Sequence, residues 1–310
     1  MCYVHLEPEE IQAQGRELNA AEWIKLGEQA IDAETLFLTI TGGEPLMHPQ
    51  FPEIYEALTE MGFFITLQTN LSLMDGKMMD LIGERPPRAI KSTIYGATDE
   101  TYEKVCGVKN GLKLVRRGIE NVKRAGIPLI LVSTVIRENQ DELNAIHQLA
   151  ADYGLPLAHT HNVMNTRRNG NGAQILSSRI LFEDLTDKEK KEANIKPHQK
   201  IRTPLEGCGN YKNGGYWILW NGYLSLCAHM DLDYSPLAEK SNGKPEGIAS
   251  CFNRMLDDLD KKYPTGCCDS CKANQFCRTC PAVLYADNTV PGEGKCLTAQ
   301  RMMECIENME

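Results

Sequence analysis

The first half of this chain alternates between two kinds of segment, and this alternation restricts its fold more than any other feature. Five runs rich in β-branched and apolar residues, each following a segment with helical spacing, stand at 35–41, 63–69, 88–95, 128–135 and 155–162. Strands that alternate with helices form right-handed βαβ units and lie side by side in a parallel sheet. The pattern therefore predicts an α/β fold with five parallel strands.

The segments before and between these runs have the apolar spacing of amphipathic helices. The predicted helices are 20–33, 51–61, 75–83, 99–105, 111–125 and 138–153. Nothing before residue 20 supplies a first strand, so we interpret the N-terminus as truncated within a parallel sheet or barrel. Each predicted strand ends in polar or glycine-rich residues, and parallel sheets and barrels bind their ligands at this end.

The chain of 310 residues has the composition of an ordinary globular protein, with 42% hydrophobic and 24% charged residues. No segment approaches the roughly 20 apolar residues of a membrane span, and the first residues do not resemble a signal peptide. A net charge of −9 argues against nucleic acid as a partner. We therefore expect a cytoplasmic protein, in which disulfides are rare and cysteines serve other purposes.

Ten of the twelve cysteines follow residue 207, and their grouping indicates a metal site. Four of them have the spacing C-x2-C-x5-C-x2-C: Cys268, Cys271, Cys277 and Cys280. Upstream, Cys208 precedes and Cys227 ends a predicted hairpin, 217–227, whose Asn-Gly pair at 221–222 is typical of a tight turn. On spacing alone, a zinc site and an iron–sulfur site are equally good interpretations.

Composition also divides the chain into three parts. Residues 1–165 form the predicted partial barrel, and 166–206 form a connector with one predicted helix near 184–193. Residues 207–310, rich in cysteine, glycine and turn residues, form a second domain.

Three features, in this order, resemble the radical SAM enzymes that carry a C-terminal SPASM domain. They are residues 1–5 (Met-Cys-Tyr-Val-His), residues 42–45 (Gly-Gly-Glu-Pro) after a strand, and the C-terminal cysteines. The resemblance implies a partial (β/α)6 TIM-like barrel that lacks its first strand, plus a small cysteine-rich SPASM domain with a β-hairpin. It also implies that Cys2 is the third cysteine of a C-x3-C-x2-C motif, inside which the N-terminus is truncated.

The resemblance further implies which residues bind S-adenosyl-L-methionine, the cofactor of this family. They are Met1, Tyr3, Gly42, Gly43, Glu44, Pro45, Thr69, Asn70, Ser92 and Asn139. The two glycines would allow close approach of the backbone, and Glu44 would accept from the ammonium group of the cofactor. Taken singly, the tetrapeptide is a turn and the strand-end residues are caps, and no catalytic residue is predicted. His159 and His161 alternate on a strand and are candidates for the barrel mouth.

Enzymes of this group have one [4Fe–4S] cluster at the barrel, here held by Cys2, and two auxiliary [4Fe–4S] clusters. The resemblance implies one auxiliary cluster held by Cys268, Cys271, Cys277 and Cys296, and another held by Cys208, Cys227 and Cys280. The spacing from Cys277 to Cys280 is x2 where the family has x3, which leaves the role of Cys280 open. The fourth ligand of the second cluster is also open, with Cys267, Cys251, Cys106 or a bound substrate as candidates. The ordered motifs favour clusters over zinc.

The resemblance implies a radical S-adenosylmethionine oxidoreductase that generates a 5′-deoxyadenosyl radical to modify a peptide or protein substrate. It also implies an electron donor such as a flavodoxin or ferredoxin. Ala228 stands where the formylglycine-forming branch usually has Asp, which argues against sulfatase maturation. The alternative is an inactive fragment, or a zinc- or cluster-binding interaction protein, because the chain has one of the three barrel cysteines. For such a chain we expect no formation of 5′-deoxyadenosine.

Overall fold

The structure is a computed structural model that describes residues 8–161, 163, 177–180, 199–230, 232–276, 280–286 and 303. The chain forms two compact units. The described residues of the first unit lie within Leu18–Met164 and Ala173–Arg179, and those of the second lie within Val4–Glu17 and Ile180–Glu310. The predicted helix near 184–193 lies outside the described residues.

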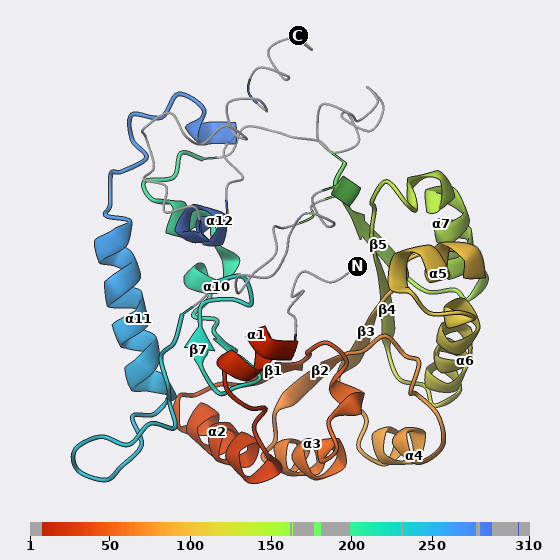
Figure 1. The fold of residues 1–310 in the computed structure, drawn as a ribbon, viewed down its shortest axis with the longest axis horizontal. Helices are drawn as coiled ribbons and strands as arrows, with labels where there is room; N and C mark the ends of the chain where they lie inside the picture. Colours follow the sequence, from red (N-terminus) through yellow and green to blue (C-terminus); the bar gives the residue numbers. More distant parts are fainter. Residues whose placement is uncertain are drawn as a thin grey trace. The chain divides into compact units, whose positions relative to one another are not determined.

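The first unit is built on one parallel sheet of five strands, in the order β1-β2-β3-β4-β5 (Figure 1). The strands are β1 (Phe37–Ile40), β2 (Phe64–Gln68), β3 (Ala89–Thr93), β4 (Leu129–Thr134) and β5 (Leu157–Thr160). Every neighbouring pair is parallel. Each strand falls within one of the five predicted runs, and the order in the sheet follows the chain. The predicted partial α/β barrel is therefore confirmed.

Six helices alternate with these strands and lie along the outer side of the arc that the strands form in Figure 1. They are α2 (Ala20–Asp32), α3 (Phe51–Glu60), α4 (Gly76–Glu84), α5 (Asp99–Cys106), α6 (Gly111–Arg124) and α7 (Leu143–Asp152). The helix predicted at 138–153 is shorter than expected. Its first residues form a 3-10 turn, η2 (Gln140–Glu142), because the side chain of Asn139 accepts from the backbone N of Ile136 (2.8 Å) and holds a loop before the helix.

Alternate residues of each strand point to opposite faces of the sheet. The outer face, covered by the helices, carries buried residues such as Leu67, Ile90 and Leu131. Strand register places the following residues on the opposite face, here called the inner face: Phe37, Thr39, Thr41, Phe64, Thr66, Gln68, Ala89, Lys91, Thr93, Ile130, Val132, Thr134, Ala158 and Thr160. Two contacts between neighbouring strands confirm this assignment: the rings of Phe37 and Phe64 stack at 5.4 Å, and Thr41 Oγ1 donates to Gln68 Oε1 (3.2 Å).

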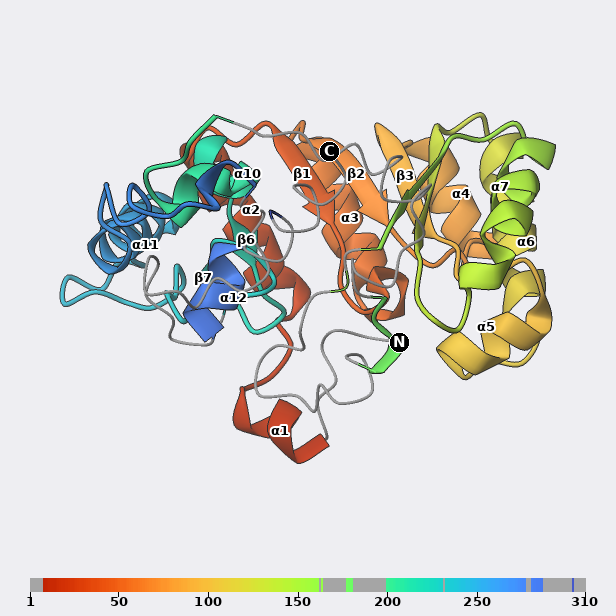
Figure 2. The ribbon, with the colours of Figure 1, turned by 90° about the horizontal axis from the view of Figure 1, so that it is seen from above.

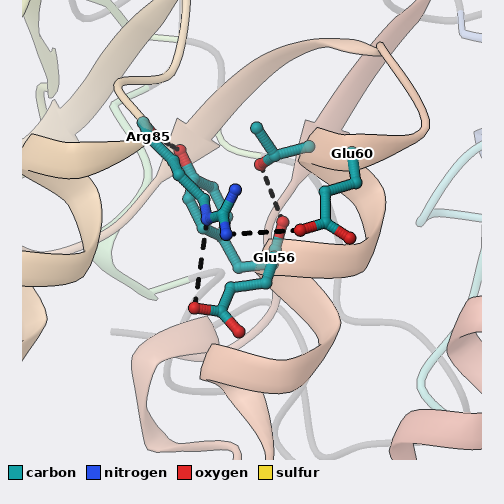
Figure 3. A network of polar contacts seen from close by, with 5 residues as sticks. Glu56, Glu60 and Arg85 are labelled. Atoms are coloured by element: carbon teal, nitrogen blue, oxygen red, sulfur yellow. Dashed lines mark hydrogen bonds and ion pairs between the residues drawn. The ribbon is translucent and has the colours of Figure 1, made fainter.

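A polar network joins α3 to Arg85, the residue after α4 (Figure 3). The guanidinium of Arg85 lies 3.2 Å from Glu60 Oε1 and 3.9 Å from Glu56 Oε1. The hydroxyl of Tyr55, whose side chain is fully buried, donates to the carbonyl of Arg85 (2.6 Å). Burial raises the pKa of Tyr55 to about 12, so this donor keeps its proton. The ion pairs are half-exposed and contribute little, so the buried hydroxyl is the main link.

The second unit contains short elements around a hairpin. They are α1 (Pro8–Ala13), η4 (Pro204–Gly207), α10 (Gly209–Lys212), β6 (Trp217–Ile218), β7 (Leu224–Ser225), α11 (Ile248–Lys262), η5 (Asn274–Phe276) and α12 (Pro281–Ala286). The predicted hairpin is confirmed, since β6 and β7 pair antiparallel. Leu219 N donates to Tyr223 O (2.8 Å), so the connection has three residues, and Gly222 takes the left-handed conformation with φ 86°.

Helix α11 is absent from the sequence prediction. Its buried residues, Ile248, Cys251, Met255 and Leu259, recur every three or four positions, and the helix lies beside β7 (Figure 2). The helical spacing is present in the sequence, but the surrounding cysteines, glycines and turn residues obscure it. Within the described part of the chain, no helix combines the length and the apolar character that crossing a membrane requires.

Candidate functional site

The loop after β1 carries a carboxylate that joins the ends of two neighbouring strands. Glu44 Oε1 accepts from Thr69 Oγ1 (2.7 Å) and from the backbone N of Leu46 (3.2 Å). Glu44 Oε2 accepts from the backbone N of Asn70 (2.7 Å). Thr69 and Asn70 directly follow β2, so the structure brings together three of the predicted cofactor-binding residues. They lie at the carboxyl end of the sheet, where parallel sheets bind ligands.

Burial raises the pKa of the Glu44 carboxyl above its ordinary value. The hydrogen bonds from Asn70, Thr69 and Leu46 lower this pKa and offset only part of the effect. A nearby positive charge favours the ionised form of such a carboxyl group. The side chain is therefore suited to an ammonium group brought to this end of the sheet.

Gly42 and Gly43 precede Glu44 and are exposed. A Cβ at Gly43 would meet no atom within 4 Å, and a Cβ at Gly42 would meet only the backbone N of Pro45 at 4.0 Å. Neither glycine has a positive φ. Neither the packing nor the backbone conformation of this chain therefore requires glycine here. A bound molecule that approaches the backbone closely would require glycine at these positions, because a side chain would stand in its way. The two glycines therefore fit a bound cofactor.

Pro45 lies directly after this loop and is buried. It is the first residue of the 3-10 turn η1 (Pro45–Met47), whose N-cap is Glu44. The fixed φ of proline suits this position and orients the carboxylate before it.

Ser92 lies on the other side of the sheet from this loop. Its register partner on β4 is Leu131, and it is buried on the outer face with 2% of its surface exposed. Its Oγ has no hydrogen-bond partner in the described part of the chain. The structure thus does not bring Ser92 to the inner face. The next residue, Thr93, faces inward at the carboxyl end of β3.

Asn139 lies at the same end of the sheet, where it holds two loops in place. Its Nδ2 donates to Tyr95 O after β3 and to Thr134 O at the end of β4, both at 3.0 Å. Its Oδ1 accepts from Ile136 N, as described above. The side chain is buried, with 1% exposed, and both its donors and its acceptor contact backbone. The structure therefore gives Asn139 a role in positioning loops.

Glu142 holds the same loop from a second point. Its carboxylate accepts from the backbone N of Ala97 and from the hydroxyls of Thr98 and Thr101, each at 2.7 Å. Burial acts to raise the pKa of Glu142, but these hydrogen bonds outweigh it and hold the pKa below its ordinary value. A Cβ at Gly96 would lie 2.7 Å from Thr101 Cγ2, so glycine is required there by packing. The sequence did not single out Glu142.

The two strand histidines share a face, as predicted, since the rings of His159 and His161 lie 5.8 Å apart. The expectation that they face the barrel mouth is wrong for His159. Its Nδ1 lies 3.1 Å from Nε2 of His147, which belongs to α7. It is paired with Ser133 of β4 and thus lies on the helix-covered face of the sheet.

In the second unit, two segments that carry predicted cluster ligands are joined by their backbones. The carbonyl of Arg202 accepts from the backbone N of Gly266 (3.0 Å) and of Cys268 (3.3 Å). Asn274, with 1% exposed, donates to Ile201 O (2.7 Å) and Cys268 O (2.8 Å) and accepts from Ile201 N (2.8 Å). The turn that carries Cys268 and Cys271 is thereby fixed to the segment that leads into Cys208.

Two further contacts surround Cys208. Asn210 Nδ2 donates to the carbonyl of Leu226, next to Cys227 (2.8 Å). Helix α12, which follows Cys280, packs against η4, which ends just before Cys208. Cys251 is fully buried in α11, and burial raises its pKa to about 11, which does not favour a thiolate ligand.

Some predicted site residues lie outside the described residues: Met1, Cys2, Tyr3, Cys277 and Cys296. Over the ranges that are described, no three His, Cys, Asp or Glu side chains converge closely enough to hold a metal ion. The structure therefore leaves the predicted cluster ligand sets as predictions.

This chain is similar in sequence to several known proteins. Residues 1–150 match the family model of the radical SAM superfamily. The AdoMet-dependent heme synthase of Methanosarcina barkeri is 24% identical over 80% of this chain and 78% of its own length. The PqqA peptide cyclase of Granulibacter bethesdensis is 24% identical over 52% of this chain. The match covers 43% of that cyclase, so the chain spans less than half its length.

The fold is also similar to a solved structure described as native anSMEcpe with bound AdoMet and Cp18Cys peptide. The TM-score is 0.58 at 15% identity, over 94% of this chain and 92% of that one. This likeness covers 94% of the chain, whereas the family model ends at residue 150 and includes β1 to β4 but not β5. Residues 1–150 of this chain are therefore identified as a radical SAM domain.

Proposed function

We propose that this chain is a radical S-adenosylmethionine oxidoreductase that modifies a peptide or protein, with 207–310 as its SPASM domain. The observation that supports this best is the Glu44 network beside Gly42 and Gly43. It lies inside the radical SAM match, at the end of the sheet where ligands bind.

In this proposal each residue of the loop acts on S-adenosylmethionine through a contact that its geometry permits. Glu44 accepts from the ammonium group of the cofactor, and Thr69 and Asn70 hold the carboxylate in place. Gly42 and Gly43 let the backbone approach it, and Pro45 fixes the turn. Thr93 takes the inward position that the sequence assigned to Ser92, while Asn139 positions the loops after β3 and β4.

We further propose that Cys2, with Met1 and Tyr3 beside it, belongs to a barrel [4Fe–4S] cluster. The auxiliary clusters are assigned to Cys268, Cys271, Cys277 and Cys296, and to Cys208, Cys227 and Cys280. When bound and reduced by a flavodoxin or ferredoxin, such a cluster would supply one electron for reductive cleavage of the cofactor, with a 5′-deoxyadenosyl radical and methionine as the products. The backbone contacts of Arg202 and Asn274 hold the segments leading to both auxiliary sets in one arrangement.

A peptide substrate is supported by what the relatives act on or bind. One is a peptide cyclase, and the similar solved structure holds a peptide together with AdoMet. The contrasting proposal is a protein that binds zinc through the same cysteines and has no redox chemistry, since paired C-x2-C units also suit zinc.

The first test measures binding of S-adenosylmethionine to protein reconstituted without oxygen. We expect Glu44→Ala to weaken binding about tenfold or more, because it removes a charge-assisted hydrogen bond. Glu56→Ala, which removes an exposed carboxylate of α3, is the matched control and should leave binding unchanged. Equal affinity of wild type and Glu44→Ala would exclude the proposed cofactor site.

The second test measures iron, acid-labile sulfide and zinc on the same preparation. Two auxiliary clusters give about eight iron and eight sulfide per chain, and an assembled barrel cluster adds about four of each. Stoichiometric zinc without sulfide would replace the redox proposal with a metal-stabilised binding protein.

A further inference from the structure

The inner face of the sheet carries one charged side chain among its strand residues. Of the inner-face residues defined above, Lys91 alone is ionised at neutral pH, and the others are apolar, hydroxyl or amide side chains. Lys91 lies on β3, the middle strand, with Gln68 of β2 and Ile130 of β4 directly beside it in register.

Lys91 also lacks a partner of opposite charge. Its side chain is exposed, and within the described residues no carboxylate forms an ion pair with it. Two arginines outside the inner face do have such partners: Arg85 pairs with Glu60 (3.2 Å), and Arg117 pairs with Asp75 (2.5 Å). A cation that a ligand encloses must be paired, because an unpaired buried charge costs several kcal/mol.

The inner face changes in character along the strands. At its amino end lie the stacked rings of Phe37 and Phe64, exposed by 63% and 54%, and the guanidinium of Arg88, which precedes β3, lies over the Phe37 ring (5.4 Å). Its carboxyl end is polar, with Thr41 bonded to Gln68 and with Thr93 one inward position beyond Lys91. Lys91 therefore stands at the boundary between an apolar surface and the end of the sheet that carries Glu44.

We propose that Lys91 is a specificity-determining residue that binds the carboxylate of an acidic side chain, Asp or Glu, of the substrate peptide. This inference rests on the proposed function, in which the inner face holds a peptide. The ammonium group of lysine is a compact point charge that suits one carboxylate. The chain as a whole has a net charge of −9, so an acidic peptide gains no general attraction and depends on a local cation.

A second source of the same chemistry is the methionyl carboxylate of S-adenosylmethionine. The cofactor loop follows β1, two strands from Lys91, which is about 10 Å across a sheet. That separation favours the substrate as the source, and the experiment distinguishes the two.

The probe is a library of capped octapeptides in matched pairs, each with Glu or Gln at one position, passed over immobilised protein in about 50 mM salt. We expect wild type to retain Glu peptides about fivefold more than their Gln partners, which corresponds to one modest ion pair. Lys91→Met should abolish this preference. Lys77→Met, which removes an exposed lysine of α4, should keep it.

Two outcomes would overturn the inference: no preference for Glu in wild type, or the same preference in Lys91→Met. A third arm compares S-adenosylmethionine with its decarboxylated analogue. If Lys91→Met weakens only the carboxylated compound, the carboxylate belongs to the cofactor and the assignment to the substrate is wrong. If the wild-type protein did not bind S-adenosylmethionine at all, the proposed function would be refuted. The preference for Glu peptides is measured in a separate assay, so the two outcomes can be distinguished.

Discussion

The loops after β1 and β3 both contain glycine at the same end of the sheet, but for opposite reasons. Around Gly96 the chain itself leaves no room for a Cβ, since Thr101 and Glu142 lie within 3.1 Å of where that atom would stand. Around Gly43 no atom of the described residues lies within 4 Å of that position. Packing requires glycine at position 96, whereas the described packing does not require it at position 43. A glycine that the fold does not need is thus the better indicator of a ligand.

The same contrast applies to the two asparagines at this end. Asn139 is buried, and its three hydrogen bonds are to backbone groups: Ile136 N in its own loop, Tyr95 O after β3 and Thr134 O at the end of β4. Asn70 is exposed, and its Oδ1 accepts only from Ser72 N (2.9 Å) within its own turn. The β3–β4 side of the site is therefore rigidly built, whereas the β1–β2 side presents its groups outward.

The largest expected effect comes from Asn139→Ala. The substitution leaves the backbone groups of Ile136, Tyr95 and Thr134 without their partner, which should lower the free energy of unfolding by about 3 kcal/mol. Asn70→Ala is the matched control and should cost less than about 1 kcal/mol, because the turn remains open to water. Urea unfolding of the two variants tests this, and equal losses would remove the distinction between the two sides.

A smaller effect separates the two glycines. Gly96→Ala should lower the free energy of unfolding by about 1–3 kcal/mol, since Thr101 and Glu142 must move. Gly43→Ala should change it by less than about 0.5 kcal/mol, yet weaken binding of S-adenosylmethionine about tenfold. Thermal unfolding and equilibrium dialysis measure the two quantities. A stable Gly43→Ala variant with unchanged affinity would show that no ligand approaches this loop.

The smallest effect is a difference in pH dependence between Glu142 and Glu44. The pKa of Glu142 is lowered in the fold, so its stabilising contribution is present above the ordinary value of 4.5 and is lost as pH falls below it. The pKa of Glu44 is raised, so ionisation destabilises the fold as pH rises past 4.5.

Urea unfolding from about pH 3 to pH 6 tests these signs with Glu142→Gln and Glu44→Gln. The stability advantage of wild type over Glu142→Gln should shrink on acidification. Its advantage over Glu44→Gln should shrink as pH rises. The same trend for both variants would contradict the opposite environments described here.

Sequence patterns predicted the sheet well because the strands alternate with helices and because β2, β3 and β4 are buried on their outer face. The runs at 63–69 and 128–135 contain the buried Leu67 and Leu131, whose alternation with less buried residues is a local signal. The hairpin was predicted correctly for a similar reason, since Gly222 supplies the left-handed conformation of its turn.

The sequence could not settle which side of a strand each polar residue faces. Ser92 and Thr93 are adjacent and chemically similar, and only the register with β4 shows that Thr93 points inward. A shift of one residue along a strand moves to the opposite face of the sheet. A motif match alone therefore locates a site to within a few residues but does not identify which side chain points into it. Counting alternate positions from the buried Ile90 would have identified Thr93 and Lys91 as the inward residues.

Glu142 and Asn274 were missed because their partners are distant in sequence. Glu142 binds the loop at 97–101, and Asn274 binds Ile201, 73 residues away. No local pattern marks a side chain whose role is to hold remote backbone. Helix α11 differs, since its periodic apolar residues were visible and were outweighed by composition.

The side-chain amide of Asn274 accepts from the backbone N of Ile201 and donates to its carbonyl. It thus pairs with Ile201 in the way that the backbone of a neighbouring strand does. The segment 201–208 thus gains an extra pairing partner without a strand beside it. Part of the scaffold around the cysteines is in this way assembled by the polypeptide itself. For the auxiliary clusters proposed in this unit, the entropy of ordering these two segments would therefore be lost during folding and not when iron binds.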